Sequence, residues 1–243
     1  MISKKTVLIT GGSGYIGSHL AEFYAKNNYN IAISYHNNFP ASQSIAASLK
    51  TLGTQCIAIK TDLSNHDDAK ILVEETLKTF GKIDVLINNA ANSENKLIQT
   101  MSEEEWDKVI STDLSGCFWT LKYTASEMVK QNSGSIINIS SIIALNGAAG
   151  CANYAAAKAG LISLTKSAAF ELGKNNITVN AVMPGFHLEG LGKDATEKYV
   201  KAAKEASVLK TTTAIDELSK FIFLLSESKT VSGQIFNWDS RIV

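Results

Sequence analysis

Arginine is almost absent from this sequence. Arg241 is the only one, although lysine and arginine together number 23 in 243 residues. The same number of acidic residues gives a formal net charge of zero. This balance offers no electrostatic argument for binding to nucleic acids or anionic membranes, so we expect neither as a partner. No apolar run approaches the ~18 residues of a membrane-spanning helix.

Cysteine is also scarce. Cys56, Cys117 and Cys151 are odd in number, widely spaced and form no C-x-x-C pair. This pattern predicts neither a disulfide framework nor a metal site, and a small buried hydrophobic role fits each residue. Cys151, three positions before Tyr154, is the one candidate for a reactive thiol. No signal-peptide pattern opens the sequence, and we therefore expect a soluble, cytoplasmic protein.

Short apolar runs alternate with helical stretches along the whole chain, without a linker, repeat or low-complexity tract. The length and the 45% hydrophobic content predict one α/β domain over residues 1–243. The expected strands are residues 6–10, 30–34, 55–60, 85–88, 135–140, 178–183 and 233–238. The expected helices are residues 18–26, 42–52, 67–80, 106–129 and one that contains Tyr154. This alternation predicts a doubly wound, mostly parallel seven-stranded sheet with helices on both faces, a three-layer αβα architecture.

Ligands bind such sheets in a crevice beyond the carboxyl ends of the strands. Gly11, Asn88, Ser141 and Pro184 each lie at or just after the end of an expected strand. We therefore expect these four positions to converge on one crevice, although they are far apart in the sequence.

A glycine-rich turn follows the first expected strand. It reads Gly11-Gly12-Ser13-Gly14-Tyr15-Ile16-Gly17 and leads directly into a helical stretch. Glycines permit close backbone approach, and the N–H groups and dipole at a helix N-terminus attract anions. The pattern predicts a cradle for a pyrophosphate group.

Tyr154 and Lys158 stand four residues apart, thirteen and seventeen residues after Ser141. On a helix, positions i and i+4 share a face, so the phenol and the ammonium would point together toward Ser141. A neighbouring positive charge favours the phenolate and lowers the pKa of a tyrosine. We therefore expect Tyr154 to exchange a proton near neutral pH. A lone pair of this kind could equally stabilise only a helix surface.

These motifs, in this order, resemble the short-chain dehydrogenase/reductase family, most closely its 3-oxoacyl-[acyl-carrier-protein] reductase branch of fatty acid biosynthesis. The resemblance covers nearly the whole chain and implies a Rossmann-type fold. It also implies hydride transfer between a nicotinamide cofactor and a ketone or alcohol. Tyr154 would be the general acid/base, Lys158 would assist it and bind ribose, and Ser141 would hold the substrate oxygen. The matching residues are Thr10, Gly11, Gly14, Gly17, Asp62, Leu63, Asn88, Asn89, Ala90, Leu114, Ser115, Gly116, Ser141, Tyr154, Lys158, 177–182, Pro184 and Gly185.

The residues after the second expected strand bear on the choice of cofactor. An acidic side chain there would hold the ribose hydroxyls of NAD and repel the extra phosphate of NADP. The sequence has Tyr35, His36 and Asn37 instead, which favours NADP(H) and leaves NAD(H) open. His36 could also be an ordinary surface histidine. The resemblance places Asp62 and Leu63 beside the adenine, where Asp62 could instead cap a helix, and Asn89 and Ala90 beside its ribose. The complete set of expected cofactor residues is Gly11, Ser13, Gly14, Tyr15, Ile16, Tyr35, His36, Asn37, Asp62, Leu63, Asn89, Ala90, Tyr154, Lys158, Pro184, Gly185, Phe186 and His187.

The chain departs from the family pattern in three places. The first turn has Gly11-x-x-Gly14-x-x-Gly17 spacing, with Tyr15 where the reductases have glycine. Asp113 replaces an asparagine that in the family kinks a helix and connects Lys158 to a water chain, so we expect its charge to raise the pKa of the lysine. Phe186 and His187 follow Pro184-Gly185, where the family usually has a threonine that contacts the nicotinamide amide, and their main-chain atoms could replace it. Residues 186–206 would then form a substrate lid.

The resemblance favours reduction of a 3-oxoacyl thioester that is presented on an acyl carrier protein. Carrier proteins are acidic, and the positions expected to receive one carry Lys130 and Lys174. Another small alcohol, a sugar or a polyketide-like ketone is the alternative substrate. A non-catalytic nucleotide-sensing protein is the alternative of a different class. The resemblance also implies a homotetramer, with a homodimer as the alternative.

Overall fold

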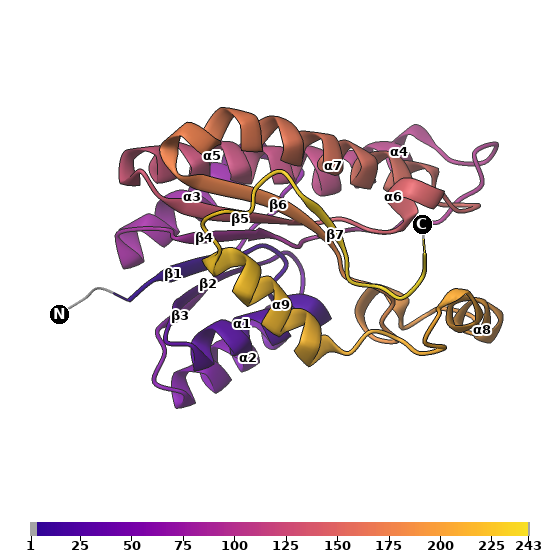
Figure 1. Ribbon diagram of the computed structural model, residues 1–243, viewed down its shortest axis with the longest axis horizontal. Helices are drawn as coiled ribbons and strands as arrows, with labels where there is room; N and C mark the ends of the chain where they lie inside the picture. Colours follow the sequence, from indigo (N-terminus) through magenta and orange to yellow (C-terminus); the bar gives the residue numbers. More distant parts are fainter. Residues whose placement is uncertain (1–3, 243) are drawn as a thin grey trace.

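The computed structural model describes residues 4–242, and its centre is one seven-stranded sheet (Figure 1). Every neighbouring pair of strands is parallel, in the order β3-β2-β1-β4-β5-β6-β7. The predicted doubly wound parallel sheet is therefore confirmed. The strands are β1 Thr6–Ile9, β2 Asn30–Tyr35, β3 Cys56–Lys60, β4 Val85–Asn88, β5 Gly134–Ile139, β6 Ile177–Met183 and β7 Ile235–Asn237.

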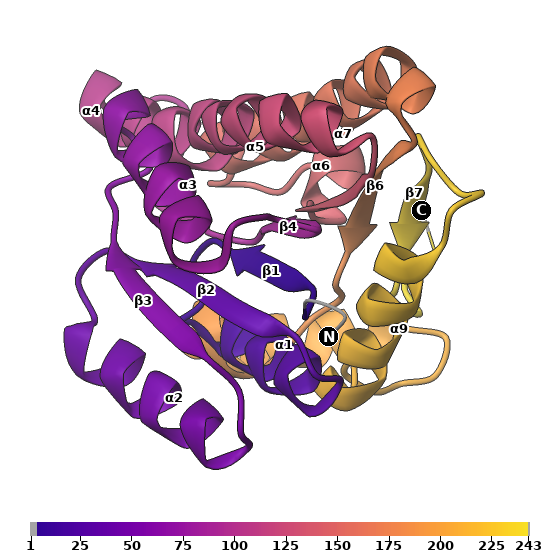
Figure 2. The same cartoon turned by 90° about the vertical axis from the view of Figure 1, so that its left-hand side faces the viewer.

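Helices cover both faces of the sheet and make three layers (Figure 2). One face carries α1 Tyr15–Lys26, α2 Phe39–Thr51 and α9 Ile215–Glu227. The other carries α3 His66–Phe80, α5 Cys117–Gln131 and α7 Ala152–Leu172, with α4 Glu103–Ile110 and the short α6 Ile143–Asn146 at the same side. Helix α8, Glu197–Ala206, lies apart from these layers, beyond one end of the sheet.

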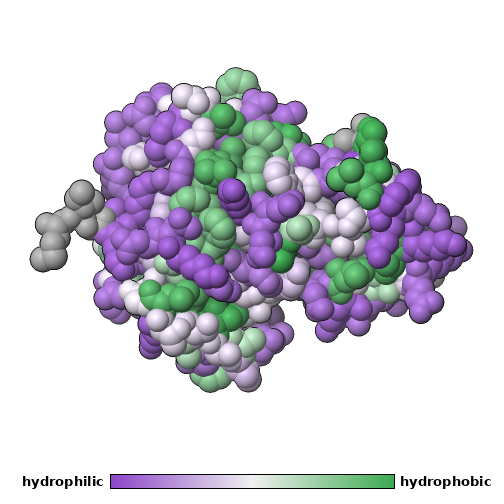
Figure 3. Space-filling model, turned by 60° about the horizontal axis from the view of Figure 1, so that its bottom comes forward, coloured by the Kyte–Doolittle hydropathy of each residue, from purple (hydrophilic) through white to green (hydrophobic). Residues whose placement is uncertain are grey.

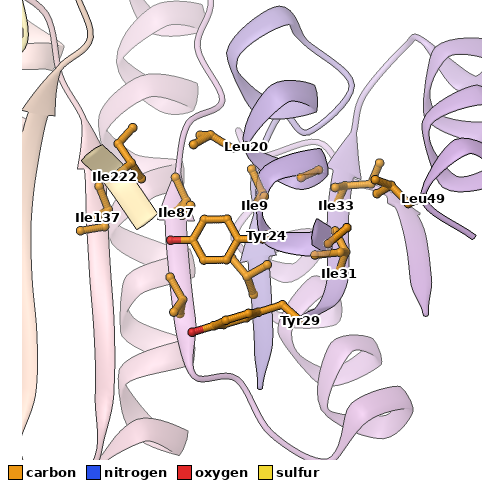
Figure 4. Packing of buried hydrophobic residues seen from close by; sticks show 14 of the residues in the cluster. Ile9, Leu20, Tyr24, Tyr29, Ile31, Ile33, Leu49, Ile87, Ile137 and Ile222 are labelled. Carbon is orange, nitrogen blue, oxygen red and sulfur yellow. The ribbon is translucent and has the colours of Figure 1, made fainter. Parts of the chain in front are cut away.

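The strands are buried on both faces, and their side chains alternate between two apolar cores. Val7, Ile9, Ile31 and Ile33 belong to the core beneath α1 and α9, which also contains Tyr24 (Figure 4). The second core lies under α3, α5 and α7 and is built from the intervening strand residues, such as Leu8, Leu86 and Ile136, with Leu72 and Met128 from the helices. Because both faces are covered, the free space for a ligand lies at the strand ends.

The order of the strands reverses between β1 and β4. From β1 the chain moves outward through β2 and β3, and it then returns to the other side of β1 at β4. The loops after β1 and β4 therefore separate at their carboxyl ends and leave a crevice there. This is the edge at which we expected Gly11, Asn88, Ser141 and Pro184 to converge.

The structure differs from the expected elements in three places. Helix α1 begins at Tyr15 rather than at residue 18, so its first turn is part of the glycine-rich motif. The expected long helix is interrupted by a π-helical segment, η1, at Ser111–Gly116. Helix α9, which was not expected, contributes Leu218, Ile222 and Leu225 to the core. Two short 3-10 segments, η2 Gly173–Asn175 and η3 Gly190–Gly192, complete the chain.

Candidate active site

A large cleft opens at the carboxyl ends of the strands, with a volume of about 1290 Å³. Every residue predicted for the site lines it except two buried ones: Asp113 lies behind its wall, and Asn88, which was expected at the crevice, instead bonds to Asn138 and Thr120 in the interior. The cleft thus joins residues from positions 11 to 187 into one surface, as the topology predicts. The predicted residues along it are Gly11, Ser13, Gly14, Tyr15, Ile16, Tyr35, His36, Asn37, Asp62, Leu63, Asn89, Ala90, Ser141, Tyr154, Lys158, Pro184, Gly185, Phe186 and His187.

The glycine-rich turn is tightly packed against its neighbours. Gly11 has a φ of +62°, and a Cβ atom there would lie 2.8 Å from the Cα of Ala90. A Cβ atom on Gly17 would lie 2.5 Å from the carbonyl oxygen of Gly11. Only glycine fits either position without a shift of the backbone. The hydroxyl of Thr10 accepts hydrogen bonds from the main-chain N–H groups of Asn89 and Ala90, at 2.9 and 3.0 Å, and thereby ties the turn to the loop after β4.

The N-terminus of α1 faces this cleft without a side-chain cap. Its first N–H groups have no acceptor within the helix, and the helix dipole adds partial positive charge. Gly14 precedes the helix and is exposed, with only the Gly11 carbonyl near the position of a Cβ atom. An uncapped helix start beside an open glycine turn fits the pyrophosphate group of a dinucleotide.

No acidic residue follows β2 along the cleft wall. Tyr35, His36 and Asn37 occupy that place, and the His36 ring lies 3.7 Å from a carboxylate oxygen of Asp62. Hydrogen bonds from Ser64 are the main cause that lowers the pKa of Asp62, with a smaller contribution from His36. The Asp62 side chain accepts from the N–H and hydroxyl of Ser64, so it stabilises its own turn as well as bordering the cleft.

Lys158 and Asp113 form a buried ion pair at the back of the cleft. Their side chains are 2% and 0% exposed, and Nζ lies 3.2 Å from Oδ2 of the aspartate. The lysine also donates to the carbonyl of Ile139 at 3.2 Å. Burial is the largest single effect on Lys158 and lowers its pKa, but Asp113, with smaller contributions from Tyr154 and Cys117, raises it by more in total, so the lysine pKa is raised, as predicted. The ammonium is therefore a permanent positive charge in this cleft.

The π-helical segment η1 places Asp113 opposite Lys158. A π-helix inserts an extra residue into the turn, which turns side chains away from the regular helical positions. The main-chain N–H of Asn92 donates to the other carboxylate oxygen of Asp113 at 2.7 Å, which fixes its orientation. Burial raises the pKa of Asp113, and Lys158 and this N–H counteract that rise.

The pKa of Tyr154 is raised, and the prediction of a lowered value was wrong. Burial is the largest cause and favours the neutral phenol, while Lys158 lowers the pKa and Asp113 raises it. The lysine ammonium lies 5.5 Å from the centre of the phenol ring. The sequence showed the charges of Lys158 and Asp113 but not the burial of the phenol, which is the largest effect on its pKa. Tyr154 is thus held as a proton donor.

Ser141 stands beside the phenol at the start of α6. Its hydroxyl accepts from the N–H of Ile143 at 3.2 Å and forms a hydrogen bond with Tyr154 that lowers the tyrosine pKa. Two hydroxyl groups side by side can both donate to one carbonyl oxygen. This corner of the cleft can therefore hold a carbonyl oxygen and give it a proton.

The loop after β6 closes the opposite wall. Here the His187 ring lies against the Tyr15 ring with 5.6 Å between their centres, and its Nε2 lies 3.1 Å from the Pro184 carbonyl oxygen. Burial lowers the pKa of His187, so the ring is neutral. Tyr15, which replaces a family glycine, therefore packs between the glycine turn and this loop.

Two functional features were not foreseen in the sequence. Arg241 lines the cleft, where its guanidinium pairs with Asp239 and lies 5.9 Å from the Phe186 ring centre. The hydroxyl of Ser34 accepts from the N–H of Gly11 at 3.0 Å and supports the turn.

The cysteines show no activated thiol. Cys56 and Cys117 are buried, and burial raises the pKa of Cys151.

Comparison with known proteins agrees with this geometry. The family model for short chain dehydrogenase matches residues 5–200. A 3-oxoacyl-[acyl-carrier-protein] reductase of Staphylococcus aureus is 37% identical over 236 residues, which are 95% of this chain and 94% of that protein. A 3-oxoacyl-[acyl-carrier-protein] reductase of Synechocystis is 33% identical over 246 residues, which are 100% of this chain and 98% of that protein.

A crystal structure of a short-chain alcohol dehydrogenase from Sinorhizobium meliloti matches the fold with a TM-score of 0.93. The two sequences are 23% identical, and the matched region covers 98% of this chain and 96% of the Sinorhizobium chain. The chain belongs to the short-chain dehydrogenase/reductase family. It is an oxidoreductase of that family. Within residues 4–242, no helix is long and apolar enough to cross a membrane.

Proposed function

We propose that this protein reduces the ketone of a 3-oxoacyl thioester, presented on an acyl carrier protein, to the 3-hydroxyacyl thioester with NADP(H). The observation that carries the proposal is the Tyr154 phenol, kept protonated by burial, beside Ser141 and above the Lys158–Asp113 pair. The relatives described above are reductases of this name. A single domain over residues 1–243, with a lid at about residues 186–206, is part of the same proposal.

In the proposed reaction, the hydroxyl groups of Ser141 and Tyr154 donate hydrogen bonds to the ketone oxygen. When bound in the cleft, the reduced cofactor supplies the hydride that adds to the ketone carbon. Tyr154 gives its proton to the oxygen as negative charge develops there, and Lys158 stabilises the resulting phenolate. Asp113 keeps Lys158 charged and fixes its position through the ion pair of 3.2 Å. In the reverse direction the phenolate takes the proton from the alcohol.

The proposed preference for NADP(H) rests on the wall after β2. Tyr35, His36 and Asn37 present no carboxylate there, so nothing on that loop repels a 2′-phosphate. The N–H groups of the uncapped α1 would bind the pyrophosphate, and Asn89 and Ala90 would border the ribose. Steady-state kinetics with NADPH and NADH in parallel test this preference, and equal or better turnover with NADH would contradict it.

The decisive experiment measures cofactor oxidation with acetoacetyl thioester on a carrier protein and on coenzyme A. Tyr154→Phe should reduce kcat by roughly 10²–10⁴-fold, because general acid catalysis typically contributes that much. Cofactor affinity of the variant, measured by fluorescence titration, should stay close to that of the natural protein. Turnover that survives the substitution would show that Tyr154 is not the proton donor.

Two other outcomes of that experiment have a defined meaning. Activity on other ketones, sugars or alcohols, but not on the thioesters, would support the alternative substrate class. Cofactor binding without turnover on any of them would support the nucleotide-sensing alternative. The intact trio of Ser141, Tyr154 and Lys158 argues against a sensor, because a protein that has lost the reaction no longer needs these three side chains together at one cleft.

A further inference from the structure

Arg241 is the only arginine of the chain, and the fold brings it to the cleft. The residues after β7 run toward the end of α8 (Figure 1). There Arg241 forms an antiparallel bridge with Ser207, and the N–H of Val208 donates to the carbonyl of Ser240 at 2.9 Å. The side-chain amide of Asn237 donates to the carbonyl of Arg241 at 3.0 Å. The main chain that carries the arginine is therefore held on both sides.

Asp239 fixes the direction of the guanidinium. One of its carboxylate oxygens accepts from the main-chain N–H of Arg241 at 2.9 Å, and the other accepts from Nε at 2.7 Å and from Nη2. The side chains of Asp239 and Arg241 are only 6% and 14% exposed, and Asp239 does not line the cleft. The acid thus lies behind the base. A guanidinium held in this way is a preorganised donor, because it loses little further freedom when a ligand binds.

One nitrogen of this guanidinium remains available. Nη1 of Arg241 has no hydrogen-bond partner among residues 4–242, and it is not buried. Its two N–H groups can therefore donate to a ligand. The guanidinium carbon lies 5.9 Å from the ring centre of Phe186, which lies 5.4 Å from the ring centre of Tyr199 on α8. All three side chains line the cleft, and we call them the lid-side cluster.

The lid-side cluster lies where a substrate would leave the cleft. Ser141 and Tyr154 belong to another wall, which α6 and α7 provide, whereas Phe186 and Tyr199 belong to the expected lid. The lid region projects from the body of the molecule, with hydrophobic side chains among hydrophilic ones on its surface (Figure 3). A ketone held at the catalytic corner would therefore leave the rest of a long substrate to extend along the lid.

The charges around the cluster decide which kind of ligand fits it. Asp239 balances the positive charge of Arg241, and Glu189 and Asp194 add two exposed carboxylates that line the cleft on the lid. An anionic group would therefore meet more negative than positive charge on this wall. A neutral acceptor, such as an amide carbonyl, would meet the N–H groups of Nη1 without that repulsion.

We infer that Arg241 is a specificity-determining residue, which donates hydrogen bonds to an amide carbonyl oxygen of the arm that carries the acyl thioester. The inference rests on the proposed function. Acyl carrier proteins and coenzyme A both present the acyl group on a pantetheine arm, whose amides are neutral acceptors. With the ketone at Ser141 and Tyr154, this arm passes the lid-side cluster. Recognition of the arm leaves the proton transfer from Tyr154 unchanged and strengthens the binding of substrates that carry amides.

The test compares Arg241→Met with the natural protein on two neutral, carrier-free thioesters. Acetoacetyl-pantetheine carries the amides, and S-ethyl acetothioacetate has the same reacting group without them. Methionine keeps an unbranched apolar stem beside Phe186 and removes the donors. The variant should lose about tenfold in kcat/KM on the pantetheine thioester, as expected for a hydrogen bond from a charged donor, and remain within about twofold on the ethyl thioester.

Lys193→Met is the matched control. It removes a positive charge from an exposed residue of the same lid that does not line the cleft. Its kcat/KM should stay within about twofold of the natural value on both thioesters. Cofactor affinity, measured by fluorescence titration, and assembly, measured by light scattering, should be unchanged in both variants.

A loss confined to the pantetheine thioester in Arg241→Met supports the inference. An equal loss on both thioesters, or no loss on either, overturns it. A change of cofactor affinity or assembly in this variant also overturns it, because the arginine would then serve the structure of the chain end. Absence of turnover by the natural protein on either thioester would refute the proposed function instead. Calorimetric binding of pantetheine itself would still test the inference, since Arg241→Met should weaken it by a similar factor.

Discussion

Asp113 contributes a buried negative charge directly behind the wall of the cleft. It is fully buried beside Lys158, and its carboxylate raises the pKa values of both the lysine and Tyr154. An asparagine would keep the acceptor for the N–H of Asn92 but would remove the charge. We therefore expect the aspartate to set the pH range of the proposed reaction, although it does not line the cleft.

We predict that Asp113→Asn lowers the pKa of Tyr154, because the charge of Lys158 then acts on the phenol without a counterion. Reduction needs the protonated phenol, so its rate should fall at a lower pH than in the natural protein. Oxidation of the 3-hydroxyacyl product needs the phenolate, so its rate should begin to rise at a lower pH. A displacement of about one unit or more is expected from a neighbouring charge. The measurement is kcat against pH in both directions.

The control for this prediction is the same pH series on cofactor binding, which does not require proton transfer. A profile that is identical in the two proteins would show that the Asp113 charge has no influence on the phenol. A loss of cofactor binding or of thermal stability would instead indicate that Asp113 serves mainly to hold η1.

At the scale of single residues, the sequence predicted which residues form the site better than it predicted their pKa values. Ser141, Tyr154 and Lys158 were identified from their spacing and their resemblance to a family, and all three line one cleft. The direction of the Tyr154 pKa shift was not predictable, because burial is a property of the folded chain and here it exceeds the effect of a charge four residues away. Arg241 was missed for a similar reason, since only the fold returns the end of the chain to the cleft.

Among the elements, the junction of η1 and α5 leaves no room for a side chain at Gly116. A Cβ atom on Gly116 would lie 2.6 Å from the carbonyl oxygen of Leu63, and Leu63 lines the cleft where adenine is expected. We predict that Gly116→Ala lowers the free energy of unfolding by about 1–3 kcal/mol through overpacking. It should also weaken cofactor binding several-fold, because the loop after β3 must move. Urea denaturation and fluorescence titration measure the two effects.

Gly173→Ala is the matched control. Gly173 has an ordinary helical φ of −57°, and nothing lies within 4 Å of the position of a Cβ atom. The substitution should leave cofactor binding unchanged and be neutral or stabilising by about 0.4–1 kcal/mol, because it restricts the unfolded chain. If both variants behave alike, the close contact with Leu63 is not what makes Gly116 necessary.

The elements themselves were largely predictable, and the exceptions have physical causes. Every strand was identified because each apolar run is short, rich in β-branched residues and bounded by turn residues, and these three features favour a strand over a buried helix. The start of α1 was placed too late because glycine has a low helix propensity, and here Gly17 is inside the first turn of the helix. The π-helical segment in the expected long helix has no periodic signature in sequence, since it depends on the contact of Asp113 with Lys158 and Asn92.

The molecule as a whole leaves apolar side chains uncovered on the outer layer of α5 and α7. Phe170 on α7 is 90% exposed, and Phe118 and Val129 on α5 are each 39% exposed. Each helix packs only one of its faces against the sheet, so its outer face is available for contact with a second copy of the chain. A homotetramer is the expected assembly, with a homodimer as the alternative.

We predict that Phe170→Glu shifts the assembly from tetramer toward smaller species in light scattering after size-exclusion chromatography. Burial of one phenylalanine side chain stabilises an interface by roughly 1.5–3 kcal/mol, and a twofold interface would contain two copies of Phe170. A buried carboxylate at both positions should therefore be enough to separate the subunits. The matched control is Ile71→Glu on α3, where an apolar side chain is 50% exposed and should not affect assembly. Equal dissociation by both variants would point to general destabilisation, and an unchanged tetramer in both would place the interface on another face. Because Phe170 lies near the opposite end of α7 from Tyr154 and Lys158 and does not line the cleft, the dissociated Phe170 variant should still bind cofactor.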